Sequence, residues 1–358
     1  MPKEEILLTP GQRIKPTVDT SLAINLVNKL YSLTVTSVTE LNSYDDKNFH
    51  VICKATHENP WIDQIAEDGY VLKIMNSLDS RNTEIIQGQN QLMIFLNDND
   101  LTCSHPVKNI KGAYYSLETL EEDKEKYAVR LLVYRPGILL CRATMTAELL
   151  RKVGSLAGNV DELLKKFHHP AYENHKTLWM LTSLPRLREF IYVIVNSEDR
   201  QLVVEVIEKF ENDVLNRIDE LDRGIIHGDL NEQNILVNEN GKDIVAVIDF
   251  ADTQKSCLVF ELAIATCYMM LHAQDLAMGR HVLKGYQEVR DLNKMEKSIL
   301  KVCICARFCQ SLVLGVYTYL NDPQNEYLLI TQKNGWKLLK KLWNMNDDEV
   351  REIWDLSY

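Results

Sequence analysis

Two short polar segments around a predicted β-hairpin constrain this chain more than any other feature of it. The first, HGDLNEQN, contains Asp229 and Asn234, and the second, IDFAD, contains Asp249. Between them, NILVN and DIVAVIDF have the apolar content of strands, and Asn240-Gly241 is a typical hairpin turn. The pattern predicts that both polar segments lie at the ends of one rigid hairpin, where catalytic groups are often placed.

The spacing of these residues is typical of a phosphoryl-transfer site. Asp229 can accept the proton of a substrate hydroxyl, while Asn234 and Asp249 offer oxygen ligands that hold Mg²⁺ against nucleotide phosphates. We expect His227 to orient the loop by hydrogen bonds. Asp252 could hold a second metal or support the loop, and we favour support. HGD alone is uninformative, because a turn aspartate often caps a loop; the three residues together in a strand context favour a catalytic site.

The region before the hairpin predicts a sheet lobe. Strand-like runs are TVTSVTELN, NFHVICKA, YVLKIMN, GAYYSL and YAVRLLVY, with a helix between them at EIIQGQNQLMIFLN and a leading helix at TVDTSLAINLVNKLYSL. After Pro136-Gly137 the pattern is helical, and the hairpin carries the only strand signal. We therefore predict a two-lobe, protein-kinase-like α+β fold, with a nucleotide-binding sheet lobe at 1–135 and a helical lobe with the catalytic loop and substrate site at 136–358. The nucleotide is expected in the cleft between them.

Lys73 lies in the middle of the predicted strand YVLKI. A strand lysine is usually a solvated edge residue, but its apolar neighbours suggest that this one points inward, to meet the α- and β-phosphates. Such a lysine needs an acid from the following helix. Glu84 is the acid available there, while Gln87 stands where a glutamate is expected.

Other residues are candidates for nucleotide contacts. The turn between the first two predicted strands contains no glycine. Its residues Ser43, Tyr44 and Asn48 can nevertheless donate hydrogen bonds to phosphates. An ordinary hairpin turn explains them equally well. The run LLVY, with Leu132 and Tyr134, would present its backbone to a purine edge. Nothing in it distinguishes adenine from guanine.

Two charged residues fall inside apolar helical stretches. Glu261 and Arg307 are expected to pair with each other or with polar neighbours, because an unpaired buried charge is costly. The functional alternative is that they recognise the ammonium and carboxylate groups of a substrate.

Composition narrows the class of partner. A net charge of −11 argues against nucleic acid or an anionic membrane as the main partner. The N-terminus lacks the pattern of a secretory signal, so a cytoplasmic location with reduced thiols is expected. Cys303, Cys305 and Cys309 lie in an apolar run without a CxxC pair, which favours core cysteines over a metal site.

HGD-x4-N followed by IDFAD resembles the aminoglycoside phosphotransferase and choline kinase group. Within that group, SYDDKNFHV, KFHHP and ARFCQSLV resemble a subfamily that uses GTP and Mg²⁺ to phosphorylate the hydroxyl of 5-hydroxy-L-lysine in the cytoplasm. The resemblance extends from about residue 17 to the C-terminus. The alternatives are another amine or amino-alcohol kinase of the same fold, acting on homoserine or choline, and a nucleotide-binding scaffold without catalysis. The complete set of motif residues argues against the scaffold.

Overall fold

The computed structural model describes residues 7–120, 125–325 and 329–356. By its internal contacts the chain divides into two compact units. One is Gln12–Pro136, and the other joins Met1–Gly11 to Gly137–Tyr358. The first is a sheet with helices on it, the second is mostly helical, and the fold is mixed α+β.

The unit Gln12–Pro136 is built on an antiparallel sheet. Its strands are β1 (Leu33–Leu41), β2 (Lys47–His57), β3 (Tyr70–Ile74), β4 (His105–Val107), β5 (Ser116–Thr119) and β6 (Lys126–Val133), and its helices are α1 (Thr20–Tyr31), η1 (Asp79–Arg81) and α2 (Thr83–Asp98). The order is β1-β2-β3-β6-β4, with β5 also beside β6. The sequence did not predict β4, because three residues that include Pro106 are too short to show strand periodicity. β5 also begins later than the predicted run 112–117.

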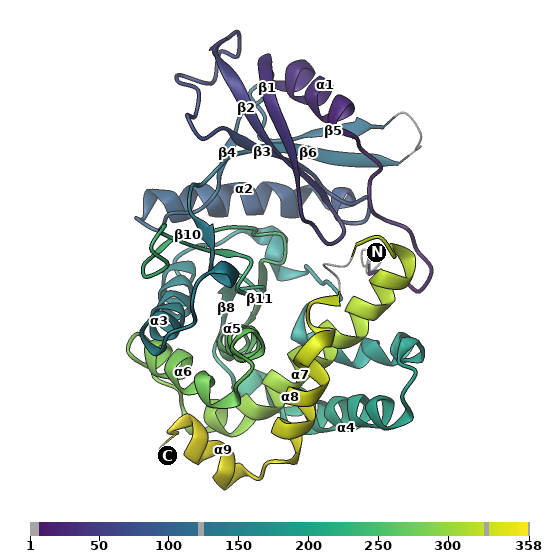
Figure 1. The fold of residues 1–358 in the computed structure, drawn as a ribbon, viewed down its shortest axis with the longest axis vertical. Coiled ribbons are helices and arrows are strands. Elements are labelled where there is room, and N and C mark those ends of the chain that lie inside the picture. Colours follow the sequence, from purple (N-terminus) through teal and green to yellow (C-terminus); the bar gives the residue numbers. More distant parts are fainter. Residues whose placement is uncertain (1–6, 121–124, 326–328, 357–358) are drawn as a thin grey trace. The chain divides into compact units, whose positions relative to one another are not determined.

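Alternation along the strands gives the two faces of this sheet different roles. Phe49, Leu72 and Leu131 lie in register across β2, β3 and β6 and pack in the core cluster that includes α1. Their neighbours Lys73 and Arg130 therefore project from the opposite face. That face is covered by α2, and Figure 1 shows α1 and α2 on opposite sides of the sheet.

The second unit is helical, with short strands among its helices. Its α-helices are α3 (Ala147–Leu164), α4 (Ser197–Asp213), α5 (Leu258–Ala273), α6 (Gly279–Gln287), α7 (Lys294–Asn321), α8 (Gln332–Asn344) and α9 (Asp347–Trp354). Its 3-10 helices are η2 (Leu140–Arg142), η3 (Pro170–Glu173), η4 (Leu181–Glu189), η5 (Ile191–Val193), η6 (Leu215–Glu220) and η7 (Leu276–Met278). Its strands are β7 (Ile138–Leu139), β8 (Arg223–Ile226), β9 (Ile235–Val237), β10 (Ile244–Val247) and β11 (Gln254–Cys257).

These strands form two small antiparallel groups, β10-β9-β7 and β11-β8. The predicted hairpin is β9 and β10. The prediction that it carries the only strands of this half was wrong, since β7, β8 and β11 are present. They are two to four residues long, too short for an alternating pattern to be visible.

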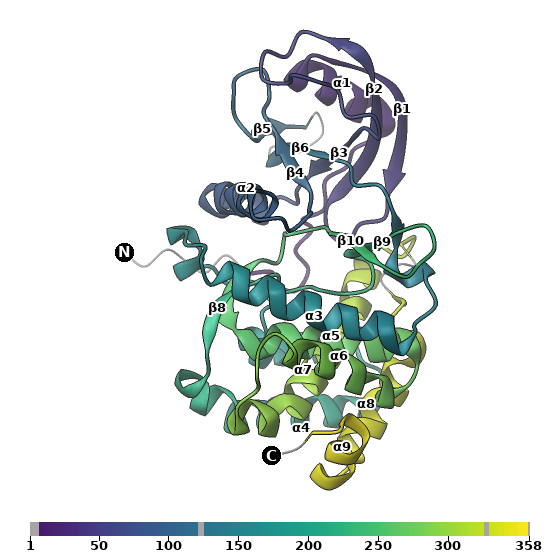
Figure 2. The same ribbon diagram turned by 90° about the vertical axis from the view of Figure 1, so that its left-hand side faces the viewer.

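Two apolar helices form the centre of this unit. α5 is buried on all sides and packs against α3, α6 and α7 (Figures 1 and 2). α7 is long and apolar enough to cross a membrane by length and composition, but 89% of its most apolar window is buried inside the unit, as in a core helix. Cys303, Cys305 and Cys309 are buried on α7, as expected of core cysteines.

Candidate active site

The two polar segments face each other because paired strands flank them at both ends. Residues 227–234 run from β8 to β9, and residues 248–253 run from β10 to β11. β8 pairs with β11 through Ile226 and Gln254, and β9 pairs with β10 through Ile235 and Val247. The hairpin alone fixes one end of each segment; the β8–β11 pair fixes the other.

Gly228 allows the two segments to approach closely. Its φ is +82°, and a Cβ at this position would lie 2.4 Å from the backbone oxygen of Asp252. Its N–H donates to Glu261 Oε2 at 3.1 Å. Glu261, on α5, is 0% exposed and lies beneath the loop. This placement is against the expectation that Glu261 binds a substrate ammonium, because a group that contacts substrate needs exposed surface.

His227 connects the two segments and is fully buried. Its Nδ1 accepts from the N–H of Asp229 at 3.2 Å, and its Nε2 lies 3.1 Å from the carbonyl oxygen of Ile248. These contacts fit a neutral imidazole with its proton on Nε2. The ring also packs on Phe250, with centroids 4.8 Å apart. His227 therefore holds the loop rather than facing a ligand.

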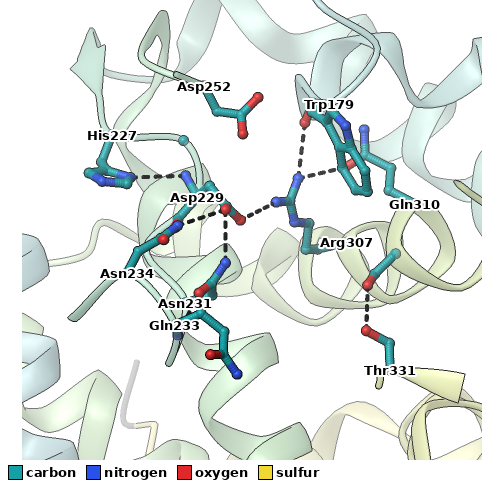
Figure 3. A network of polar contacts seen from close by, with 12 residues as sticks. Trp179, His227, Asp229, Asn231, Gln233, Asn234, Asp252, Arg307, Gln310 and Thr331 are labelled. Atoms are coloured by element: carbon teal, nitrogen blue, oxygen red, sulfur yellow. Dashed lines mark hydrogen bonds and ion pairs between the residues drawn. The ribbon is translucent and has the colours of Figure 1, made fainter. Parts of the chain in front are cut away.

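Asp229 lies at the centre of a polar network (Figure 3). Its Oδ2 accepts from Asn231 Nδ2 at 2.8 Å and from Asn234 Nδ2 at 2.9 Å. Its Oδ1 accepts from Arg307 Nη2 at 2.7 Å. Burial raises the pKa of Asp229, and the guanidinium of Arg307 opposes that shift. The sequence did not single out Asn231, although it lies inside the motif.

Asn234 and Asp249 are held side by side, because the N–H of Ile248 donates to the backbone oxygen of Asn234 at 2.9 Å. The side-chain nitrogen of Asn234 faces Asp229, so its Oδ1 is turned away from Asp229. Asp249 has φ +59°, and its Oδ1 accepts from the N–H of Ala251 at 3.3 Å. Left-handed backbone at a non-glycine residue is often found at functional sites. An outward amide oxygen beside a half-buried carboxylate is a donor set that suits Mg²⁺.

Arg307 reaches this loop from α7, 1% exposed. We expected Arg307 to pair with Glu261 or with a polar neighbour, and it forms an ion pair with Asp229. Its Nη1 donates to the carbonyl of Trp179 at 3.1 Å. Its guanidinium lies over the rings of Trp179 and Tyr268, 5.0 and 5.3 Å from their centroids. Trp179 gave no signal in the sequence, because it belongs to an irregular segment far from the motif. Asp252 is half-buried on the facing segment (Figure 3).

In the other unit, Lys73 is 4% exposed and forms an ion pair with Asp46, Nζ to Oδ2 3.0 Å. The register places Asn48, Lys73 and Arg130 in one row across β2, β3 and β6. Leu132, two residues after Arg130, projects from the same face. The sheet thus brings together residues that the sequence predicted from separate strands.

The remaining candidates near the sheet are Tyr134, Ser43 and Tyr44. Tyr134 stacks on His50, with ring centroids 4.0 Å apart. Ser43 Oγ donates to the backbone oxygen of Asp46 at 2.6 Å, which closes the turn, and Tyr44 is half-buried beside it.

The helix α2, which follows β3 in the sequence, carries the polar residues Glu84 and Gln89. Glu84 has an exposed side chain in the first turn of α2, and its pairing with Lys73 stays a prediction. Gln89, one turn further on and 1% exposed, accepts from Arg130 Nη1 at 3.1 Å.

A model of the phosphotransferase enzyme family matches residues 55–296. The chain belongs to this family. It is 36% identical to a hydroxylysine kinase of Xenopus laevis over 95% of the chain and 94% of that relative, and 35% identical to one of Danio rerio over 95% and 96%. An amicoumacin kinase solved in complex with AMP-PNP, Ca²⁺ and Ami has the same fold, with TM-score 0.67, 15% identity, and coverage of 93% and 97%. The chain therefore groups with the hydroxylysine kinases and is a small-molecule phosphotransferase that acts on a hydroxyl.

Proposed function

We propose that this enzyme transfers the γ-phosphoryl group of GTP to the hydroxyl of 5-hydroxy-L-lysine, giving 5-phosphohydroxylysine and GDP. Hydroxylysine as the acceptor is supported by the similarity to hydroxylysine kinases over nearly the whole chain. GTP as donor rests on the resemblance of SYDDKNFHV and KFHHP to a GTP-using subfamily.

Asp229 is the proposed catalytic base. It orients the acceptor hydroxyl and takes its proton as the oxygen–phosphorus bond forms and the bond to the GDP oxygen breaks. Its three hydrogen bonds fix the carboxylate before the substrate binds. That fixed orientation is what general base catalysis requires of the group, because its proton acceptor must meet the hydroxyl at hydrogen-bond distance.

Asn234 and Asp249 are the proposed ligands of Mg²⁺, which would neutralise charge on the phosphates. The outward Oδ1 of Asn234 and the constrained backbone of Asp249 support this role. Lys73 would meet the α- and β-phosphates, with Asn48 beside it and the backbone at Leu132 meeting the purine edge. We assign Glu261 to the support of the loop.

We also propose a cytoplasmic location and small-molecule partners for the enzyme. All eight cysteines are free, which fits a reducing compartment such as the cytoplasm. The charge of −11 supports small molecules rather than nucleic acid or an anionic membrane as partners.

Steady-state rates on hydroxylysine, homoserine, choline and an aminoglycoside, each with GTP and with ATP, test the proposal. We expect the highest kcat/KM for hydroxylysine with GTP. Turnover of another acceptor without turnover of hydroxylysine would refute hydroxylysine as the acceptor. A higher kcat/KM with ATP than with GTP would refute only GTP as the donor.

A further inference from the structure

We infer that Arg307 is a positioning residue that fixes Asp229 so that its Oδ1, rather than its Oδ2, receives the proton of the acceptor hydroxyl. The inference rests on the proposed role of Asp229 as base. It concerns a contact between α7 and the catalytic loop that joins residues far apart in the sequence.

The hydrogen bonds of Asp229 distinguish its two oxygens. Oδ2 accepts from two amide groups, those of Asn231 and Asn234, which uses both of its lone pairs. Among the residues that the structure describes, Arg307 is the one donor to Oδ1, which leaves one lone pair for another donor. A hydroxyl that donates to this carboxylate without displacing a partner must therefore donate to Oδ1.

Hydrogen bonds at both Nη atoms and two aromatic rings hold the guanidinium of Arg307. Nη1 donates to the carbonyl of Trp179 at 3.1 Å, and Gln310 Oε1 lies 3.5 Å from the same atom. Gln310 is fixed in turn, because its Nε2 donates to the carbonyls of Leu178 and Met180 at 3.1 and 2.9 Å. The rings of Trp179 and Tyr268 lie over the guanidinium. These contacts prevent the guanidinium from turning toward a ligand.

A guanidinium held in this way fixes the position of Oδ1, and with the amides of Asn231 and Asn234 on Oδ2 it sets the orientation of the carboxylate. It also offsets the cost of burying a negative charge at Asp229. As the hydroxyl proton passes to Oδ1, the hydroxyl oxygen forms a bond to the γ-phosphorus of GTP. The bond between that phosphorus and the bridging oxygen breaks, and its electron pair stays on the oxygen of the leaving GDP. Arg307 remains hydrogen-bonded to Oδ1 throughout and does not contact the substrate.

The test uses three variants of the full-length chain. Arg307→Ala removes the contact, Arg307→Lys keeps the charge without the planar fork, and Arg290→Lys is the matched control. Arg290 is also a buried arginine of the same unit. It pairs with Asp222 and Glu296 and packs on Tyr286, none of which belongs to residues 227–234 or 248–253.

We expect Arg307→Ala to lower kcat by at least about a hundredfold, with the KM values for hydroxylysine and GTP within about threefold of wild type. Guanidinium chloride should restore kcat by about tenfold or more, while sodium chloride at the same ionic strength should not. Arg307→Lys should retain part of the activity, and Arg290→Lys should leave kcat unchanged. A merely structural role would not produce rescue specific to guanidinium.

A second measurement separates positioning from substrate binding. The ratio of kcat/KM for hydroxylysine to that for 1,5-diaminopentan-2-ol, which lacks the carboxylate, should be the same in wild type and Arg307→Lys. A ratio that falls toward one, or a loss confined to the KM for hydroxylysine, would overturn the inference, because Arg307 would then bind the carboxylate. Wild-type kcat in Arg307→Lys and Arg307→Ala would overturn it as well.

The two proposals fail in different ways. Wild-type enzyme without activity on hydroxylysine refutes the proposed acceptor, and the variants are then compared on the acceptor that is turned over. Wild-type activity that survives both Arg307 substitutions refutes only the positioning role. If Arg307→Ala does not fold, the kcat and KM values of Arg307→Lys decide the question.

Discussion

Lys73 on β3 and Asp46 in the turn before β2 form a buried ion pair, with Nζ 3.0 Å from Oδ2. The other oxygen of Asp46 accepts from the N–H of Asn76 at 2.8 Å and from its side-chain nitrogen at 3.1 Å. The turn is thereby attached to β3 and to the residues that follow it. Asp46 supplies Lys73 with a carboxylate from the turn, a partner that the sequence did not indicate.

Asp46→Asn should raise the KM for GTP by about tenfold, because it removes one charge-assisted contact that orients Lys73. The asparagine oxygen can still accept from the N–H of Asn76, so the turn should keep its conformation. Initial rates at varied GTP measure the effect. Glu40→Gln, which removes the exposed pair with Lys47, is the control and should change nothing. A lower KM would show instead that Asp46 competes with the phosphates for Lys73.

Asp229→Asn should lower kcat by at least about a hundredfold and leave the Kd for GTP nearly unchanged. The substitution is isosteric and keeps an oxygen acceptor toward Arg307, which a change to alanine would not, while its amide nitrogen replaces the oxygen that accepts from Asn231 and Asn234. Single-turnover rates and nucleotide titration measure the two quantities separately. Wild-type turnover in this variant would remove Asp229 from the role of base.

Asp249→Asn should raise the Mg²⁺ concentration for half-maximal activity by about tenfold or more, because a neutral amide binds the cation less strongly than a carboxylate. Asparagine tolerates the φ of +59° found there, so stability should be retained. A magnesium titration of activity, with thermal melting alongside, separates the two effects. Asp243→Asn on the exposed end of the hairpin is the control. An unchanged magnesium dependence would contradict the assignment of Asp249 as a ligand.

Gly228→Ala should abolish most activity and destabilise the protein by about 1–3 kcal/mol. The new Cβ would lie 2.4 Å from the backbone oxygen of Asp252, at φ +82°. The two loop segments would have to separate, which would displace Asp229. Denaturant unfolding and kcat measure the outcome. Gly241→Ala at the hairpin turn also has positive φ, but its Cβ would meet only Ala143 at 3.3 Å, so kcat should survive there.

Asp79 should make the stability of the sheet unit depend on pH. Its Oδ2 accepts from Asn76 at 2.7 Å, but burial, and then the nearby charge of Asp46, raise its pKa to about 6. Because the folded-state pKa lies above that of the unfolded chain, the contribution of Asp79 is fully present below about pH 4 and is lost as the pH rises through about 6.

Asp79→Asn tests this directly, because the amide does not titrate. The free energy of unfolding of Asp79→Asn minus that of wild type should increase by on the order of 2 kcal/mol from pH 4 to pH 7. Urea unfolding at both pH values measures it, and the difference cancels titration elsewhere in the chain. A difference that does not change with pH would show that the pKa of Asp79 is not raised.

Local sequence patterns determined much of this protein. The hairpin of β9 and β10 follows from two apolar runs around Asn240-Gly241, and the hairpin fixes the ends of the polar segments where Asn234 and Asp249 lie. The strand around Lys73 and the helices of the second unit were likewise readable, because each depends on a periodicity within one segment.

Only the tertiary structure decided what those segments meet. The β8–β11 pair that closes the loops is too short to leave a periodic signal. Asp46, which pairs with Lys73, lies in a turn, and Arg307, which pairs with Asp229, lies 78 residues further along the chain. Neither is identifiable from spacing along the chain. Local conformation is encoded by near neighbours, whereas the pairing of buried charges depends on which distant surfaces pack together, and that is fixed only when the core forms.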